Sequence, residues 1–424
     1  MPISPPLALP DAGPAEPNRS LLPESLMTAQ ARPLAEAIAT GSPYLRQLML
    51  RDPDYAAAVF YQAPEALLDA EISGLASVDG ALSQAEVMRA LRMAKKRVAL
   101  LIAVADLSGR WPVEQVTDAL TTFADAALQA AVCWLLADSA RQGKVTLTDH
   151  ARPAQGCGYV ALAMGKQGAR ELNYSSDIDL IILYDPLTPL LPDSSEAATF
   201  FVRFTRRLVQ LMQDVTEDGY VFRTDLRLRP DPRATQAAIS IEAAGIYYEN
   251  QGQNWERAAM IKARAAAGDV ALGEEFLKRL TPYVWRKYLD FAAIADVQSL
   301  KRQIHAVKGH GEIKVRGHNI KLGRGGIREI EFFVQTQQLI AGGRNPTLRG
   351  RGTLAMLDAL AAAQWISAGA ADELKQAYRF LRTLEHRVQM VNDEQTHVLP
   401  ADDLAFAALA RFSGHADAEA FDAE

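Results

Sequence analysis

The stretch GKQGARELNYSSDIDLIILYD, residues 165–185, places the strongest single constraint on the fold of this chain. Its second half, IDLIILY, is an apolar run with the length and composition of a buried strand. Asp177 and Asp179 lie at the start of that run, and residues two apart on a strand point to the same face. The stretch therefore predicts a buried strand with two neighbouring carboxylates at its edge.

Two further strands are predicted around this central one. GYVALAM predicts a strand at 157–164 and YVFRTDLRLRP predicts one at 221–229, with the central strand at 178–184. A helical pattern over 194–219, with Gly219 as its stop signal, separates the second strand from the third. We expect the three strands to form one mixed sheet.

The third strand brings in another carboxylate. From Phe222 to Arg229, uncharged and charged residues alternate strictly, so Asp225 is predicted to lie on a polar face. We expect Asp225 to converge with Asp177 and Asp179 on one edge of the sheet.

The rest of the chain is predicted to be helical, which makes the fold class α+β, with a small mixed sheet and extensive flanking helices. Ser83 and Glu86 have the spacing of a capping box at the start of one helix. The other clear helical patterns cover 112–143, 325–343 and 371–394. The chain ends inside a helical pattern, which predicts a fragment of a longer protein.

Four regions are expected along the chain. Seven prolines among the first 24 residues predict a disordered tail. The predicted regions are a tail at 1–24, an N-terminal helical region at 25–150, a catalytic domain at 151–299 and a C-terminal helical domain at 300–424.

Composition excludes some classes of function. The net charge of −6 argues against general nucleic-acid binding, which usually requires a basic surface. No apolar run is expected to approach the length of a membrane span, and the N-terminus has no signal-peptide pattern. Cys133 and Cys157 are interpreted as reduced core thiols. We therefore expect a cytoplasmic protein with neither nucleic-acid nor membrane partners.

The carboxylates predict a metal site. Two carboxylates this close raise each other's pKa unless a cation lies between them, and hard oxygen ligands suit Mg²⁺ or Mn²⁺. Just upstream, Gly165 and Gly168 would allow backbone N–H groups to approach an anion. With Asp225, this pattern is typical of metal-dependent phosphoryl chemistry. The alternative is a solvated strand end without a ligand.

Basic residues near these positions are candidates for phosphate binding, with an alternative for each group. Arginines on the third strand would contact phosphate oxygens or only pair with the carboxylates. Basic residues around the KLGRGG segment would contact an anion or cover a solvated surface. These candidates are Arg223, Arg227 and Arg229 in the first group and Lys321, Arg324 and Arg328 in the second. Nearby, Glu331 is interpreted as a first-turn helix acid, with a site-facing role as its alternative. Trp255 is interpreted as a packing residue, with adenine stacking as its alternative.

Five segments carry a resemblance to a known family: GKQGARELNYSSDIDLI, FRTDLRLRPDP, YYENQGQNWERAAMIKAR, IKLGRGGIREIEFFVQ and NDEQTHVLP. In this order, over roughly 45–424, they resemble the N-terminal half of the bifunctional glutamine synthetase adenylyltransferase/adenylyl-removing enzymes. The resemblance implies a nucleotidyltransferase-like fold. It also implies removal of AMP from a tyrosine of glutamine synthetase by phosphorolysis, which releases ADP.

The resemblance also implies roles for individual residues. Asp177 and Asp179 match the metal-binding pair, and Asp225 matches the later strand carboxylate. Gly165 and Gly168 match the phosphate-side loop, and Ser176 joins the predicted phosphate- and nucleotide-binding residues of the two basic groups.

The implied cofactor is Mg²⁺ or Mn²⁺. The implied partners are adenylylated glutamine synthetase, phosphate, ADP, a PII signalling protein and a covalently linked C-terminal adenylyltransferase half. Two alternatives stay open: an enzyme of the same superfamily that adds a nucleotide to a protein or small molecule, and a non-catalytic module that senses nucleotide or PII.

Overall fold

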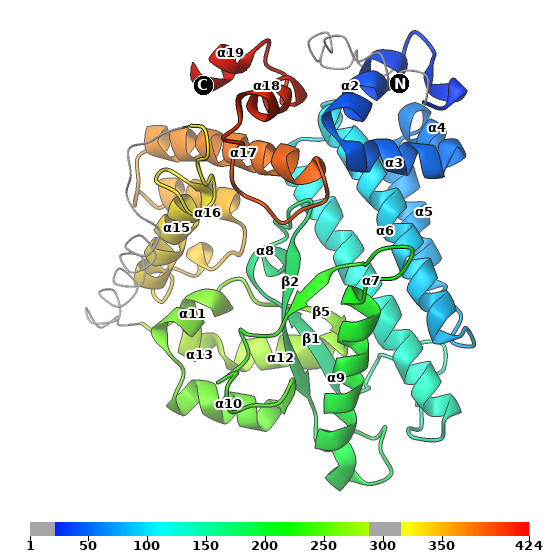
Figure 1. The fold of residues 1–424 in the computed structure, drawn as a ribbon. Coiled ribbons are helices and arrows are strands. Elements are labelled where there is room, and N and C mark those ends of the chain that lie inside the picture. The colour runs from blue at the N-terminus through cyan, green and yellow to red at the C-terminus, as the bar shows by residue number, and fades with distance from the viewer. Residues whose placement is uncertain (1–21, 288–314, 424) are drawn as a thin grey trace.

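A five-stranded mixed sheet lies at the centre of the molecule, with helices on both of its faces (Figure 1). The computed structural model describes residues 22–287 and 315–423. The strands are β1 (Tyr159–Ala163), β2 (Asp177–Tyr184), β3 (Arg223–Asp225), β4 (Ala238–Ser240) and β5 (Arg264–Gly268). Strands β3, β2, β1 and β5 are neighbours in this order, and β4 also pairs with β2.

The sheet confirms the expected fold class and the shared sheet of the three predicted strands. Strand β2 is antiparallel to β1 and parallel to both β3 and β4, while β1 is antiparallel to β5. The order of strand, glycine turn, strand, helix and strand is also as expected. Strands β4 and β5 were not predicted, because one is three residues long and the other, RAAAG, has no large apolar side chain after its arginine.

The third strand is shorter than predicted. It ends at Asp225, whose side chain accepts a hydrogen bond from the backbone N–H of Arg227 and so starts a turn. The chain changes direction there: Leu226 packs with the cluster under one face of the sheet and Leu228 with the cluster on the other. The prediction of a single alternating strand from 221 to 229 is therefore wrong beyond Asp225.

Long helices cover one face of the sheet. They are α6 (Gln84–Leu107), α7 (Val113–Arg141) and α9 (Ala197–Gln213). Their apolar side chains form one core with Ile178, Leu180 and Ile182 of β2. The Ser83–Glu86 capping box at the start of α6 is confirmed. Helix α9 ends before Gly219, contrary to expectation, because that glycine belongs to a separate turn with Thr216.

Helix α7 contradicts the expectation that no apolar run approaches the length of a membrane span. It is long and apolar enough to cross a membrane by length and composition alone. Most of this helix is buried in the core beneath the sheet, where its apolar side chains pack against those of the strands and of the neighbouring helices.

Shorter helices cover the opposite face, which carries Ile181 and Leu183 of β2. They are α10 (Ile241–Asn250), α11 (Asn254–Met260), α12 (Val270–Arg279) and α13 (Thr281–Val284). Because Asp177 and Asp179 have the same parity as Ile181, the two carboxylates point to this face.

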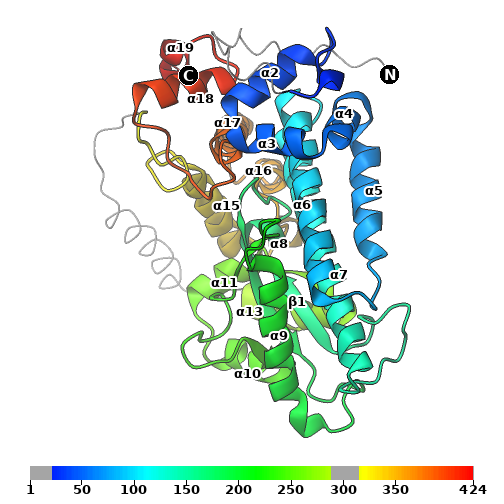
Figure 2. The same ribbon diagram turned by 45° about the vertical axis from the view of Figure 1, so that its right-hand side comes forward.

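Helices from the two ends of the chain meet above the sheet (Figure 2). Those of the N-terminal part are α2 (Arg32–Gly41), α3 (Pro43–Arg51), α4 (Pro53–Tyr61) and α5 (Pro64–Ala76). Those of the C-terminal part are α15 (Ile327–Ala341), α16 (Thr353–Ala362), α17 (Ala368–Met390), α18 (Asp403–Phe412) and α19 (Ala418–Ala423). Phe412 of α18 packs in the same cluster as Leu34 of α2, and Ser42 donates a hydrogen bond of 2.6 Å to the carbonyl of Met390.

The boundaries of the expected regions are not tested by this arrangement. The predicted disorder of residues 1–24 falls outside the described residues up to residue 21, and a single helical turn at Glu24–Leu26 follows. The predicted boundary between 299 and 300 also lies outside the described residues. The regional boundaries therefore stay predictions.

Candidate active site

The three predicted carboxylates meet at one edge of the sheet. Strand pairing sets Asp179 directly opposite Asp225, and Asp177 opposite Arg223. One oxygen from each of Asp177, Asp179 and Asp225 lies within 4.8 Å of the others. All three side chains are half-buried. The arrangement offers several hard oxygen ligands to one small space.

The glycine turn fits closely against these carboxylates. Helix α8 (Gly165–Gly168) follows β1 directly, and Gly165 has a φ of +52°. A Cβ atom at Gly165 would lie 2.8 Å from Oδ2 of Asp179, and a Cβ at Gly168 would lie 2.0 Å from the carbonyl oxygen of Lys262. Both glycines are therefore required by close approach of the backbone to its neighbours.

Two residues after this turn, Arg170 adopts a backbone conformation that usually favours glycine. Arg170 adopts a left-handed φ of 60°, and its guanidinium pairs with Asp118 and bonds to Thr122 at 2.7 Å. These contacts with α7 hold the strained residue in place.

The electrostatics of the carboxylates are unbalanced. Burial, and then the charges of Asp177 and Asp225, raise the pKa of Asp179 to about 7, although Lys321 and Arg227 act in the opposite direction. For Asp225, burial is outweighed by the hydrogen bonds and charge of Arg227, so its pKa is lowered. A metal cation would offset the charges of Asp177 and Asp225, which together with burial raise the pKa of Asp179.

The residues present fit a divalent metal. Three carboxylates with an uncompensated negative charge form the donor set that Mg²⁺ or Mn²⁺ prefers. Asp177 also accepts a hydrogen bond of 2.7 Å from the side-chain amide of Gln395, which fixes one of its oxygens.

A pocket of about 370 Å³ opens beside Asp179 and the glycine turn. Helix α11 contributes Trp255, and helix α15 contributes Arg328, Glu331 and Phe332. Lys166, Lys262 and Lys321 also line the pocket. The size is within the range of small-molecule sites, and the walls combine aromatic rings with cations. The pocket could therefore accept a planar group together with a phosphate.

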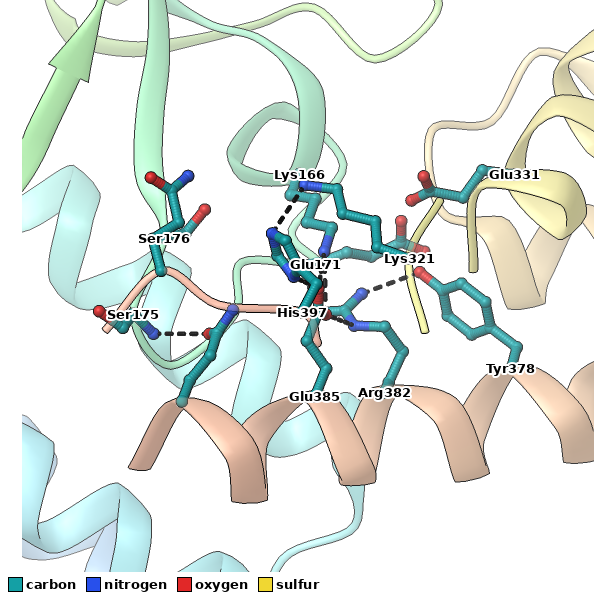
Figure 3. A network of polar contacts seen from close by, with 12 residues as sticks. Lys166, Glu171, Ser175, Ser176, Lys321, Glu331, Tyr378, Arg382, Glu385 and His397 are labelled. Carbon is teal, nitrogen blue, oxygen red and sulfur yellow. Dashed lines mark hydrogen bonds and ion pairs between the residues drawn. The ribbon is translucent and has the colours of Figure 1, made fainter. Parts of the chain in front are cut away.

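A network of buried charges supports the floor of this pocket (Figure 3). Lys166 of the glycine turn contacts both carboxylate oxygens of Glu385 at 3.0 and 2.9 Å. Arg382 and His397 also contact Glu385, at 3.1 and 2.8 Å. These partners outweigh burial and hold the pKa of Glu385 well below its usual range. Helix α17 is thus tied to the glycine turn by an ion pair between the half-buried Lys166 and the fully buried Glu385.

The second half of this network centres on Lys262. Its Nζ lies 3.2 Å from Glu171 and 3.2 Å from Glu331. Although burial acts against ionisation, Lys262 and the nearby Lys166 lower the pKa of Glu331 to about 2. Glu331 is therefore a charged residue of the pocket wall, and its interpretation as a plain first-turn helix acid is wrong.

The predicted cations are distributed unevenly around the site. Lys321 and Arg328 line the pocket, whereas Arg324 is exposed and lies outside its lining. Arg227 pairs with Asp225 at 2.5 Å, and its side chain is 83% exposed. Arg229 donates hydrogen bonds to the carbonyls of Leu226, Pro232 and Thr235 and so holds the loop that follows β3.

Two further predicted residues support the carboxylates from behind. Arg223 donates hydrogen bonds to the carbonyl and the hydroxyl of Ser175, at 2.9 and 3.1 Å, and also bonds to Tyr220. Ser176 is buried, and its hydroxyl lies 3.5 Å from Oδ1 of Asp177. Binding of phosphate or nucleotide by Ser176 and the six basic residues stays a prediction.

The structure adds residues that the sequence did not single out. Lys166, Lys262, Glu385 and Gln395 all lie at or directly behind the carboxylates and the pocket. Each belongs to, or lies close to, one of the segments that carry the family resemblance. Their partners are far away in the chain, so no local pattern identified them.

Comparison with known families agrees with this geometry. A profile of the family described as Glutamate-ammonia ligase adenylyltransferase matches residues 31–279, more than half of the chain. The chain belongs to this family. A second profile, described as GlnD PII-uridylyltransferase, matches residues 298–424.

Individual relatives carry the same description. The chain is similar to proteins named bifunctional glutamine synthetase adenylyltransferase/adenylyl-removing enzyme from three bacteria. Identity is 54% over 395 residues in Brucella melitensis, 56% over 382 in Mesorhizobium japonicum and 52% over 424 in Xanthobacter autotrophicus. These alignments cover 92%, 90% and 97% of this chain, and 40%, 39% and 43% of the relatives. The chain thus spans about two fifths of the length of the relatives it matches.

Proposed function

We propose that this chain removes AMP from an adenylylated tyrosine of glutamine synthetase by metal-dependent phosphorolysis. The observation that carries this proposal is the convergence of three carboxylates within 4.8 Å beside a glycine turn and a cation-lined pocket. The names of the relatives support the substrate, and the resemblance of the motifs to the N-terminal half of the family supports removal over addition.

In the proposed reaction, an oxygen of free phosphate forms a bond to the phosphorus of the tyrosyl-AMP group. The bond from that phosphorus to the tyrosine oxygen breaks, ADP is released, and the tyrosine oxygen takes up a proton. A Mg²⁺ or Mn²⁺ ion held by Asp177, Asp179 and Asp225 would supply charge neutralisation. The tyrosine is a moderate leaving group, with a pKa of about 10 in water.

The other residues of the site position the two phosphate groups. Lys321 and Arg328 line the pocket next to Asp179 and offer positive charge to phosphate oxygens. Trp255 and Phe332 offer flat apolar surfaces to the adenine. Gly165 and Gly168 keep the backbone close to the reacting centre. Catalysis would then rest on alignment and electrostatic stabilisation.

The proposal has consequences for partners. Adenylylated glutamine synthetase is the protein substrate, phosphate the second substrate and ADP a product. A PII signalling protein is the proposed regulator, since residues 298–424 match a profile of PII-modifying enzymes. The full-length protein would carry a covalently linked adenylyltransferase half and act in the cytoplasm, where its substrates occur.

The direct test is a product assay. The chain is incubated with adenylylated glutamine synthetase and phosphate, with and without Mg²⁺, and nucleotides are separated by chromatography. We expect ADP that depends on both phosphate and Mg²⁺. Release of AMP without a need for phosphate would indicate hydrolysis instead. If ATP and unmodified synthetase yield pyrophosphate, the chain adds nucleotide, and absence of any turnover would favour a sensing module.

A further inference from the structure

A second cavity, of about 630 Å³, lies behind the wall of the catalytic pocket. The segment that joins α11 to β5 separates the two: Ala258, Ala259 and Lys262 line the catalytic pocket, while Ile261 and Ala263 line the second cavity. We propose that the second cavity is a binding site for a small organic anion with at least two negative charges, either a phosphate ester or a dicarboxylate. This inference goes beyond the proposed function and does not depend on it.

The lining of the cavity is strongly basic. Four cationic side chains and one carboxylate face it: Arg264, Lys278, Arg349, Arg351 and Glu274. The charge of Arg264 is balanced by Asp125 at 2.8 Å. Within the described residues, no carboxylate lies within ion-pair distance of Lys278, Arg349 or Arg351. In a chain with a net charge of −6, such a local excess of positive charge calls for an anion.

Two arginines of the lining, the half-buried Arg349 and the exposed Arg351, are held in place by the backbone. Arg351 donates its Nε–H to the carbonyl of Ala263 at 2.8 Å. Arg349 donates its Nε–H to the carbonyl of Gly342 at 2.7 Å, and its guanidinium lies 5.8 Å from the ring centre of Trp285. The Nε bond of Arg351 leaves its terminal nitrogens for a ligand. Desolvation and the nearby Arg264 lower the pKa of Arg351, although the charge of Glu274 acts in the opposite direction.

The rest of the lining indicates an organic ligand. Ile261, Leu277, Leu280 and Val284 contribute apolar surface, with Trp285 at one side. A hydrated inorganic ion would gain nothing from these groups, whereas a carbon skeleton or a nucleoside would bury against them. Arginines in a fixed orientation recognise phosphate and carboxylate groups in two-point contacts.

The cavity is mechanically connected to the glycine turn. The carbonyl that fixes Arg351 belongs to Ala263, and the preceding carbonyl, of Lys262, packs against Gly168. Two residues after Arg351, the backbone N–H and the hydroxyl of Thr353 bond to Glu171 at 2.5 and 3.0 Å. A ligand that draws Arg351 into the cavity would therefore act on both supports of the catalytic turn.

Calorimetric titration of the metal-free chain tests the site. The probes are ADP, succinate and inorganic phosphate, with lactate as a monoanionic control. We expect one binding site for succinate, or a second site for ADP besides the catalytic pocket that would bind it as the product, with weaker binding of inorganic phosphate in the second cavity and none of lactate. Tighter binding of ADP would identify a phosphate ester and tighter binding of succinate a dicarboxylate, and either supports the proposal. Equal binding of phosphate and of the better organic probe would overturn the organic assignment.

Variants locate the binding. Arg351→Gln should weaken the better probe about tenfold or more, as expected for the loss of a charge-assisted contact. Lys278→Gln, on the exposed rim, should weaken it severalfold without risk to the fold. Arg411→Gln, an exposed arginine of α18, is the matched control and should leave affinity unchanged.

The alternative is that the probe binds in the catalytic pocket instead of the second cavity. Lys321→Gln should leave the affinity of the second cavity intact, because Lys321 lines the catalytic pocket and is not in the lining of the second cavity. The proposal is overturned if no probe binds, or if both Arg351→Gln and Lys278→Gln bind as the parent chain does. It is also overturned if Lys321→Gln, rather than Arg351→Gln, abolishes binding, since the ligand would then occupy the catalytic pocket. As a second readout, the better probe should slow amide hydrogen exchange in residues 349–353.

Discussion

The carboxylates Asp177, Asp179 and Asp225 and the buried charges around Glu385 both touch the glycine turn, yet their charge balance differs. The first group holds three acids against one close cation, Arg227, and the pKa of Asp179 rises to about 7. In the second group, Glu385 has Lys166, Arg382 and His397 as direct partners, and its pKa is lowered.

The difference in charge balance distinguishes the carboxylates, which form a candidate binding site, from the buried ion pairs, which hold the surrounding elements in place. Acids that repel one another destabilise the folded chain, and such an arrangement is typical of a place where a ligand cation binds. A buried ion pair contributes little net stability, because the cost of desolvation offsets the attraction, but it fixes the relative positions of the elements that carry it. Lys166, Glu385 and Lys262 would thus set the position of the glycine turn, while the carboxylates would carry out the chemistry.

The largest expected effect comes from neutralising a carboxylate of the unbalanced group. Asp177→Asn or Asp179→Asn should reduce ADP formation by about 10²- to 10³-fold or more, because charge stabilisation at the reacting centre is lost. The melting temperature without metal should stay equal or rise, since repulsion is relieved. Turnover and thermal unfolding of the same preparations test both points. Unchanged turnover in both variants would remove these residues from the metal site.

The balanced group should respond in the opposite way. Glu385→Gln leaves Lys166 and Arg382 without their counter-charge in a fully buried place, and should cost about 3–5 kcal/mol of unfolding free energy. Urea unfolding followed by circular dichroism measures this loss. Glu394→Gln, an exposed neighbour in the chain, is the matched control and should change little. Equal stability of the two variants would mean that the network does not support the fold.

Metal and pH sharpen the same comparison. The pKa of Asp179 is about 7 when folded and about 4 when unfolded. Between about pH 4 and pH 7, the folded state therefore binds a proton at Asp179 that the unfolded state has lost. The contribution of Asp179 to the free energy of unfolding is greatest below about pH 4 and is lost as the pH rises through 7. Mg²⁺ replaces the proton, so it should raise the melting temperature more at pH 8 than at pH 5.5. In Asp179→Asn this difference between the two pH values should disappear.

The sequence predicted the parts of this comparison that depend on local pattern. The strand β2, the glycine turn and the shared face of Asp177 and Asp179 follow from spacing alone, and Asp225 follows from the strand order. The end of β3 was missed because a side-chain turn at Asp225 replaces the ladder while the alternation of residues continues.

The balanced network could not be predicted in this way. Lys262 lies 91 residues from Glu171 and 69 from Glu331, and Gln395 lies 218 from Asp177. Partners so distant in the chain leave no periodic signal, and a buried lysine or glutamate looks like a surface residue in a single sequence. Their roles become visible only when α15 and α17 are packed against the sheet domain.

The smallest expected effect concerns phosphate, the second proposed substrate. Lys321 lines the pocket beside Asp179, so Lys321→Gln should raise the KM for phosphate severalfold with a smaller change in kcat, because ground-state binding is lost. Arg227→Gln should act in the same direction but less, since its guanidinium is bound to Asp225 and mostly exposed. Arg229→Gln should lower stability more than phosphate affinity, because Arg229 holds three backbone carbonyls.

The measurement is a phosphate titration at saturating adenylylated substrate, with Arg411→Gln as the control for loss of a surface charge. We expect the KM for phosphate to change most in Lys321→Gln, because Lys321 acts on both groups of charges. Its charge lowers the pKa of Asp179, and its Nζ lies 3.4 Å from Nε2 of His397 in the balanced network. An unchanged phosphate dependence in Lys321→Gln, Arg227→Gln and Arg229→Gln would defeat the proposal of a phosphate site here. It would favour water as the attacking group at the same carboxylates, with AMP in place of ADP as the product.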